Sequence, residues 1–130
     1  MSNLRVAAIA SVSLLVAGCS AGQLAEVQVQ PLQPQQLSAD QIIMVQNTVR
    51  YSLQDPNSAQ FGIIKGGKDQ DGKVVVCGQV NAKNNFGGYN GMNFVGEINS
   101  GGAFKVAALG DISDTALAIQ QICGKQGLIV

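Results

Sequence analysis

The sequence predicts an α+β domain, in which a small antiparallel sheet of about four strands is flanked by an N-terminal and a C-terminal helix. Apolar residues recur at helical spacing in two segments, one around residue 45 and one around residue 119. Between them lie four short strand-like segments, separated by turns that contain Gly, Asn and Asp. Two cysteines in this region, Cys77 and Cys123, add one disulfide to the prediction.

The first 18 residues have the organisation of a secretory signal peptide. A positive charge at Arg5 precedes an apolar run over residues 6–17, which only Ser11 and Ser13 interrupt. This run is too short to span a bilayer, which takes about 20 residues. We therefore expect residues 1–18 to be removed rather than to fold.

The end of this leader carries the string L-V-A-G-C, which closes at Cys19. It resembles the lipobox of bacterial lipoproteins. The resemblance implies that Cys19 receives a diacylglycerol thioether, that the leader is cut before it, and that the new amino terminus is acylated. Incorporation of palmitate would then report the lipidation. Ser20 stands where inner-membrane members tend to carry Asp, which implies an anchor in the outer membrane. The alternative is an ordinary signal peptide with an incidental Cys19, but a spare thiol is a liability in an oxidising compartment.

Residues 19–37 are expected to form a lipidated tether. The segment is rich in Gln, contains Pro31 and Pro34, and shows no sustained apolar period, so the sequence predicts a disordered spacer. The domain organisation is then a leader at 1–18, a tether at 19–37 and an α+β domain at 38–130.

The first helix is predicted over residues 39–54. Ser38 can cap its start, and Gln41 stands three residues on to complete a capping box. An apolar stripe follows at helical spacing: Ile42, Val45, Val49 and Leu53. Asp55 precedes Pro56 and so avoids the helical region, which ends the helix.

Four strands are predicted over residues 61–65, 73–81, 91–98 and 103–109. The first two are expected to pair as a hairpin across residues 66–72, and the last two across residues 99–102. Val74, Val75 and Val76 form a continuous apolar run, which favours burial on both faces of the sheet.

The last helix is predicted from Ser113 to Gly124, with Ile119 and Cys123 on its inner face. Cys77 shares its strand face with Val75, so a disulfide between the two cysteines would pin this helix to the sheet. The alternative of free thiols or a redox pair lacks the C-x-x-C spacing.

The composition of the chain argues against nucleic-acid binding and against catalysis that uses histidine or zinc. The chain has equal numbers of acidic and basic residues, so it has no basic field for nucleic acid. It contains no histidine, which removes the commonest general base and a leading zinc ligand, and no cofactor or metal is expected.

The polar residues considered for catalysis are not spaced so that a nucleophile, a base and an orienting group could act together: Asp55, Asp69, Asp71, Glu97, Asp111 and Ser113. Lys68 ends a P-loop-like string, but Asp69 follows where Ser or Thr is needed.

The most distinctive part of the domain is the stretch C-G-Q-V-N-A-K-N-N-F-G-G-Y-N-G over residues 77–91. With D-P-N-S-A-Q-F over residues 55–61, it resembles small uncharacterised exported proteins of bacteria and their phages, which carry D-P-x-S-x-x-F and C-G-x-V-N-A-K-N-x-F-G-G-Y-x-G. The stretch is longer than a hairpin needs, so residues 81–93 are expected to form a loop.

Two interpretations of that loop remain open. The candidate binding residues are Asn81, Lys83, Asn84, Asn85, Phe86 and Tyr89. Hydrogen-bonding side chains beside aromatic faces suit a sugar or a peptide. Alternatively, Asn and Gly supply turn conformations while Phe86 and Tyr89 close the edge of the core, which the usual burial of aromatics favours.

These features together favour a lipid-anchored, non-catalytic protein of the cell envelope that presents a small interaction domain. Its expected contacts are the membrane, through the N-terminal lipid, and an unknown envelope protein or cell-wall component. The alternative is a module that binds cell-wall glycan or peptide through residues 81–93.

Overall fold

A five-stranded antiparallel sheet lies at the centre of the structure, a computed structural model that describes residues 30–111 and 114–130. The elements in chain order are β1 (Gln33–Gln35), α1 (Ala39–Arg50), a 3-10 helix η1 (Pro56–Ser58), β2 (Gln60–Lys68), β3 (Val74–Lys83), β4 (Tyr89–Ile98), β5 (Phe104–Gly110) and α2 (Asp114–Lys125). The strands follow one another across the sheet in the order of the chain. The predicted leader, Cys19 and the first part of the tether lie outside the described residues, as does the predicted helix start at Ser113.

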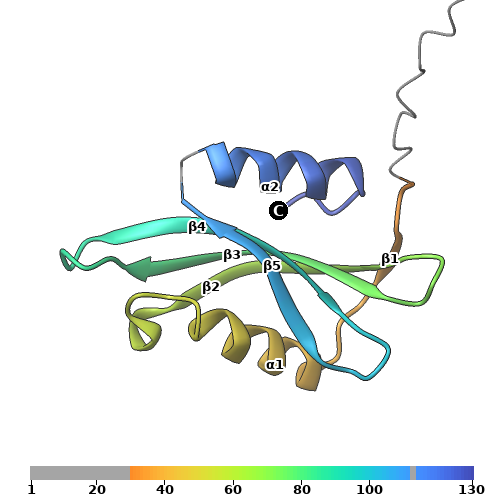
Figure 1. Ribbon diagram of the computed structural model, residues 1–130, viewed down its shortest axis with the longest axis horizontal. Helices are drawn as coiled ribbons and strands as arrows, with labels where there is room; N and C mark the ends of the chain where they lie inside the picture. Colours follow the sequence, from red (N-terminus) through yellow and green to blue (C-terminus); the bar gives the residue numbers. More distant parts are fainter. Residues whose placement is uncertain (1–29, 112–113) are drawn as a thin grey trace, which may run out of the picture.

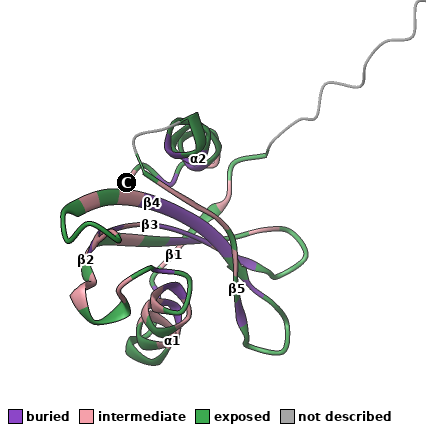
Figure 2. Ribbon diagram, turned by 60° about the vertical axis from the view of Figure 1, so that its left-hand side comes forward, coloured by how far each residue is buried: buried purple, intermediate pink, exposed green. Residues whose placement is uncertain are grey.

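The two helices cover opposite faces of the sheet, so the domain has three layers (Figure 1, Figure 2). The alternation of side chains along β3 explains why both faces need cover. Val74 and Val76 belong to the core on the α1 side, whereas Val75 and Cys77 belong to the core on the α2 side. The expected burial of this valine run on both faces is therefore confirmed.

The larger core lies between α1 and the sheet. Its buried members are Leu37, Val45, Val49, Leu53, Val74, Val76, Val80, Ala82, Phe94, Ile98 and Phe104. Two glycines make room for the rings in this layer. A Cβ at Gly78 would overlap the ring of Phe94, and a Cβ at Gly96 would lie 2.6 Å from an atom of the Phe104 ring. The close approach of ring and backbone requires glycine at both positions.

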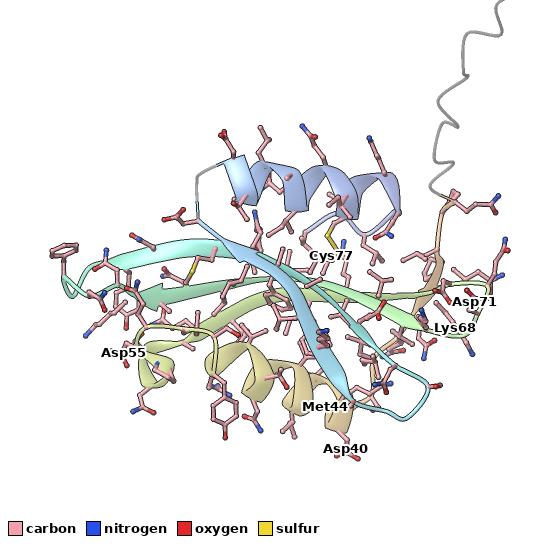
Figure 3. The ribbon with its side chains drawn as sticks, viewed as in Figure 1. Asp40, Met44, Asp55, Lys68, Asp71 and Cys77 are labelled. Atoms are coloured by element: carbon pink, nitrogen blue, oxygen red, sulfur yellow. A yellow bond between two sulfur atoms is a disulfide. The ribbon has the colours of Figure 1, made fainter. Side chains whose placement is uncertain are left out.

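The smaller core lies between α2 and the sheet, and the disulfide crosses it. Cys77 of β3 and Cys123 of α2 are both fully buried and are bonded to each other, with their Cα atoms 6.2 Å apart (Figure 3). Ile119, Leu128 and Val95 pack around the bridge. The predicted disulfide and the inward face of the last helix are confirmed.

The last part of the predicted tether is not a disordered spacer, because it forms the strand β1. Gln33, Pro34 and Gln35 pair with residues 66–68 of β2, so the sheet has five strands rather than about four. Leu32 packs into the core on the α2 side, and Leu37 is buried on the α1 side. A three-residue strand that contains Pro is tolerated here because it lies at the edge of the sheet, where a missing N–H faces no partner strand.

Both predicted helices are present, but each ends at a different residue from the one predicted. The capping box is confirmed: Ser38 Oγ accepts from Gln41 N at 3.2 Å, and Gln41 Oε1 accepts from Ser38 N at 2.9 Å. At the other end α1 stops at Arg50 instead of residue 54, because the next residues tighten into three-residue hydrogen bonds, such as Leu53 N to Arg50 O at 3.0 Å.

The helix α2 continues past Gly124, which was the expected terminator. Gly127 ends the chain's helical path instead, with φ of +80°. Leu128 N donates to Cys123 O at 2.8 Å, and Gly127 N donates to Gly124 O at 3.0 Å. This pair of bonds is a Schellman motif, which needs a left-handed residue that glycine adopts without strain.

Three hairpin loops of the same design connect β2 to β5. Each begins with an Asp or Asn and has a glycine three residues later with φ near +80°: Asp69 and Gly72, Asn84 and Gly87, Asn99 and Gly102. In each loop the glycine N–H donates to the backbone oxygen of the Asp or Asn, and a side-chain oxygen of that residue accepts a backbone N–H. Such loops fit a type I turn followed by a left-handed glycine.

The expectation of a loop over residues 81–93 is therefore wrong. β3 continues to Lys83 and β4 begins at Tyr89, so only residues 84–88 connect them. The extra length of the distinctive stretch lies in longer strands, because polar residues such as Asn81 and Asn90 are paired within the sheet.

Candidate functional site

The six predicted binding residues lie together at one end of the sheet, on the β3–β4 hairpin. Asn81 and Lys83 are in the last part of β3, Asn84, Asn85 and Phe86 are in the connecting loop, and Tyr89 begins β4. Lys83 and Tyr89 face each other across the two strands. The Lys83 Nζ lies 5.6 Å from the centroid of the Tyr89 ring, which is within range of a cation–π contact.

Asn84 has a structural role. Its Oδ1 accepts from Phe86 N at 2.9 Å and from Gly88 N at 3.1 Å, which holds the loop closed. Asp69 plays the same part in the β2–β3 loop, where its Oδ1 accepts from Asp71 N and Lys73 N, each at 2.9 Å. The part of the packing interpretation that assigned Asn and Gly to turn formation is confirmed for Asn84.

The connection between α1 and β2 holds the hairpin in place from outside. Ser58 Oγ accepts from Lys83 N at 2.7 Å and donates to Asp55 O at 2.8 Å. Gln54 Oε1 accepts from Asn85 N at 2.8 Å. Residues 55–61 and 77–91, the two strings singled out in the sequence, are thus joined by hydrogen bonds. Ser58 and Gln54 were not predicted to touch the hairpin, because no local spacing signals a contact between residues so far apart in the chain.

The packing interpretation expected Phe86 to close the edge of the core, and this expectation is wrong. Its side chain is 97% exposed, and that of Tyr89 is 47% exposed. The other two hairpin loops provide an internal comparison, since Asp71 and Gly101 occupy the position that Phe86 occupies in its own loop. The turn therefore needs no aromatic residue there, and nothing in the described fold requires the ring of Phe86.

The hairpin tip and the start of the described chain lie at opposite ends of the sheet (Figure 1). Gln30, the first described residue, lies beside the β2–β3 loop, where its Oε1 accepts a hydrogen bond from Gln70 Nε2 at 2.9 Å. Figure 3 shows Lys68 and Asp71 at this end and Asp55 toward the other. The ten residues of β3 separate the two ends, which corresponds to about 30 Å.

The part of the chain that the structure describes contains neither a metal-binding cluster nor a membrane-spanning helix. No group of three His, Cys, Asp or Glu side chains is arranged there to hold a metal ion. None of the helices in residues 30–111 and 114–130 is long and apolar enough to cross a membrane. The chain matches no protein family, no curated protein and no solved structure.

Proposed function

We propose that this protein is a lipid-anchored, non-catalytic component of the bacterial cell envelope, attached to the outer membrane, which presents the β3–β4 hairpin to an envelope partner. The L-V-A-G-C string that ends at Cys19 supports the anchor. The disulfide between Cys77 and Cys123 supports export, because such bonds persist in oxidising compartments such as the periplasm. Two or more acyl chains hold a protein stably on a membrane.

The exposure of Phe86 is the observation that most supports a role of the hairpin in binding a partner. A phenylalanine that is 97% exposed, in a turn that two sister loops build without an aromatic residue, has no structural explanation within the described domain. Exposed aromatic residues are enriched where proteins bind partners. The neighbouring Tyr89 extends the aromatic surface by a further half-exposed ring.

The position of the hairpin relative to the anchor supports a partner away from the anchoring lipid. The chain enters the domain at Gln30, about 30 Å of strand away from the hairpin tip. Between Cys19 and Gln30 the chain can span at most about 40 Å. The hairpin thus lies at the end of the sheet opposite Gln30, where the anchored chain enters the domain.

The non-catalytic part of the proposal is supported by composition and by the use of the acidic residues. The chain contains no histidine, and Asp69 serves its own turn. The other acidic side chains considered for catalysis are spread over different elements, so no nucleophile, base and orienting group can be assigned from them.

Site-specific photo-crosslinking in intact cells tests this proposal. A photo-crosslinkable amino acid is placed at Phe86 in one variant and at Asp71 in the matched control, which has the same loop position at the tether end. We expect a discrete crosslinked partner from position 86 and none from position 71. Equal yields from both positions, no adduct from position 86, or adducts only with membrane lipid would contradict the proposal.

A further inference from the structure

A polar surface on the α2 side of the sheet lies beside the hairpin and is not covered by α2. It is an open groove of about 380 Å³, and its lining includes side chains from three strands. We call it the amide face, and its members on this side of the sheet are Gln60, Gly62, Gln79, Asn81, Gly91 and Asn93. Pairing places Gln79 opposite Asn93, and Asn81 opposite both Gln60 and Gly91.

The carboxamides of this surface are not used by the fold. Within the described residues, the side chains of Gln79, Asn81 and Asn93 make no hydrogen bond to other protein groups. Asn93 is only 7% exposed, although apolar residues occupy most such positions in this protein. Polar groups at low exposure are normally paired, so these donors and acceptors remain available for a ligand or for water.

Glycines keep the groove open. An added Cβ at Gly91 would meet nothing within 4 Å, so the space above this residue is free. At Gly62 a Cβ would lie 3.3 Å from the Gln79 Oε1, which means that a side chain there would crowd the amide. Glycine within a strand marks either a bulge, as at Gly62 between Phe61 and Ile64, or a site where a ligand can approach the backbone closely, which the free space at Gly91 allows.

The chemistry of the groove selects an uncharged occupant. No Asp, Glu, Lys or Arg is among the residues that line it. Each carboxamide offers two N–H donors and an oxygen acceptor, so its best partner also donates and accepts. At the hairpin end the surface continues to Tyr89, whose ring is half-exposed and has the Lys83 ammonium 5.6 Å from its centroid, so the one charged group beside the groove lies at that end.

We propose that the amide face, with Tyr89 at its end, binds an oligosaccharide of N-acetylated hexosamines. Each acetamido group of such a sugar carries one N–H and one C=O, and it can pair with a carboxamide in both directions. The C–H faces of the sugar rings pack on aromatic rings, as in other sites that combine a few polar groups with apolar walls. This inference rests on the proposed function, because it names the chemical class of the partner at the hairpin end of the domain.

A peptide fits the surface less well. An extended peptide satisfies its backbone by pairing along the edge of a sheet. The amide face lies on the surface of the sheet between β2 and β4, where β3 pairs with β4 along its length and with β2 on either side of the bulge between Phe61 and Ile64. It therefore offers an extended peptide no continuous strand edge.

Titration calorimetry of the full-length protein in detergent micelles tests the inference. The probe is the β-1,4-linked tetramer of N-acetylglucosamine, and the comparison ligand is the glucose tetramer, which lacks the acetamido groups. We expect Gln79→Ala and Asn81→Ala each to weaken binding of the probe about three- to tenfold, as expected for a lost hydrogen bond. Gly91→Leu fills the open groove and is expected to abolish binding.

Gln120→Ala is the matched control, since it removes an exposed carboxamide from α2, away from the groove. We expect it to bind the probe as the unchanged protein does. Thermal unfolding establishes that each variant is folded. The inference is overturned if the probe does not bind, if the glucose tetramer binds equally well, or if the groove variants bind like the control. Any of these results alongside crosslinking from position 86 would reject the sugar ligand and leave the proposed function standing.

Discussion

Asn84 is held in the β3–β4 loop by two hydrogen bonds from backbone N–H groups to its own side chain. It is therefore a turn residue, although the sequence placed it among the binding candidates. The signal that identifies it is present in the chain: Asp69, Asn84 and Asn99 are evenly spaced, and each is followed three residues later by a glycine. This repeat, rather than the local composition of the stretch, indicates three equivalent hairpin loops.

The role of Asn84 gives a prediction at the scale of a single residue. Asn84→Ala removes the single side-chain oxygen that accepts both hydrogen bonds of the loop, and we expect it to lower the free energy of unfolding by about 1 kcal/mol. Asn85→Ala, next to it, removes a side chain that makes no hydrogen bond within the described residues, and should change stability by less than about 0.5 kcal/mol. Urea-induced unfolding of both variants measures the difference. Equal losses would show that the Asn84 side chain does not support the turn.

Local signals predicted the existence of most elements, because the deciding interactions are close in sequence. The capping box at Ser38, the pairing of both hairpins and the inward face of Cys123 all depend on neighbours within a few residues. The first turn is shorter than predicted, because residues 66–68 continue β2 and pair with β3. β1 was missed because three residues that contain Pro34 have no strand signal of their own. Its pairing with residues 66–68 is a long-range contact, and glycines at positions 66 and 67 allow the close approach of Leu37 and Leu32.

The candidate site was predicted only in part for the same reason. The sequence identified the residues of the hairpin, but the amide face also needs Gln60 from β2 and Asn93 from β4. Only the register of three strands brings these side chains to one surface. Burial statistics for aromatic residues also misled at Phe86, because they describe average positions and this loop points into solvent.

The disulfide gives a prediction at the scale of an element. It closes a loop between residues separated by 46 positions and joins α2 to β3. Replacing both Cys77 and Cys123 by Ala should lower the free energy of unfolding by about 4 kcal/mol, from the chain-entropy relation. Because α2 shares only a small core with the sheet, we expect its amide hydrogens to lose protection first in hydrogen exchange.

The matched measurement is the exchange of α1, which packs on the opposite face and contributes to the larger core. Its protection should fall only with the global stability. Uniform loss of protection in α1 and α2 would contradict a local role for the bridge, and unchanged stability would contradict its role in holding the layers together.

The two ends of the domain differ, and the proposals assign a different role to each end. The described chain begins at the end where the β2–β3 loop lies, and the exposed aromatic residues lie at the other end (Figure 1). Attachment at Cys19 would tie the first end to the lipid within the reach of the intervening chain and leave the second for a partner. Membrane attachment at Cys19 is therefore the central claim, since without it neither end of the domain has a defined neighbour.

The intact mass of the mature protein, purified from membranes of the producing cell, tests this claim most directly. We expect a product that begins at Cys19 and carries the mass of a diacylglycerol and an amide-linked acyl chain. In the Cys19→Ser variant that added mass should be absent, and the protein should leave the membrane-associated fraction or retain its leader. A mature protein with an unmodified Cys19, or one cut elsewhere without added lipid, would contradict the account.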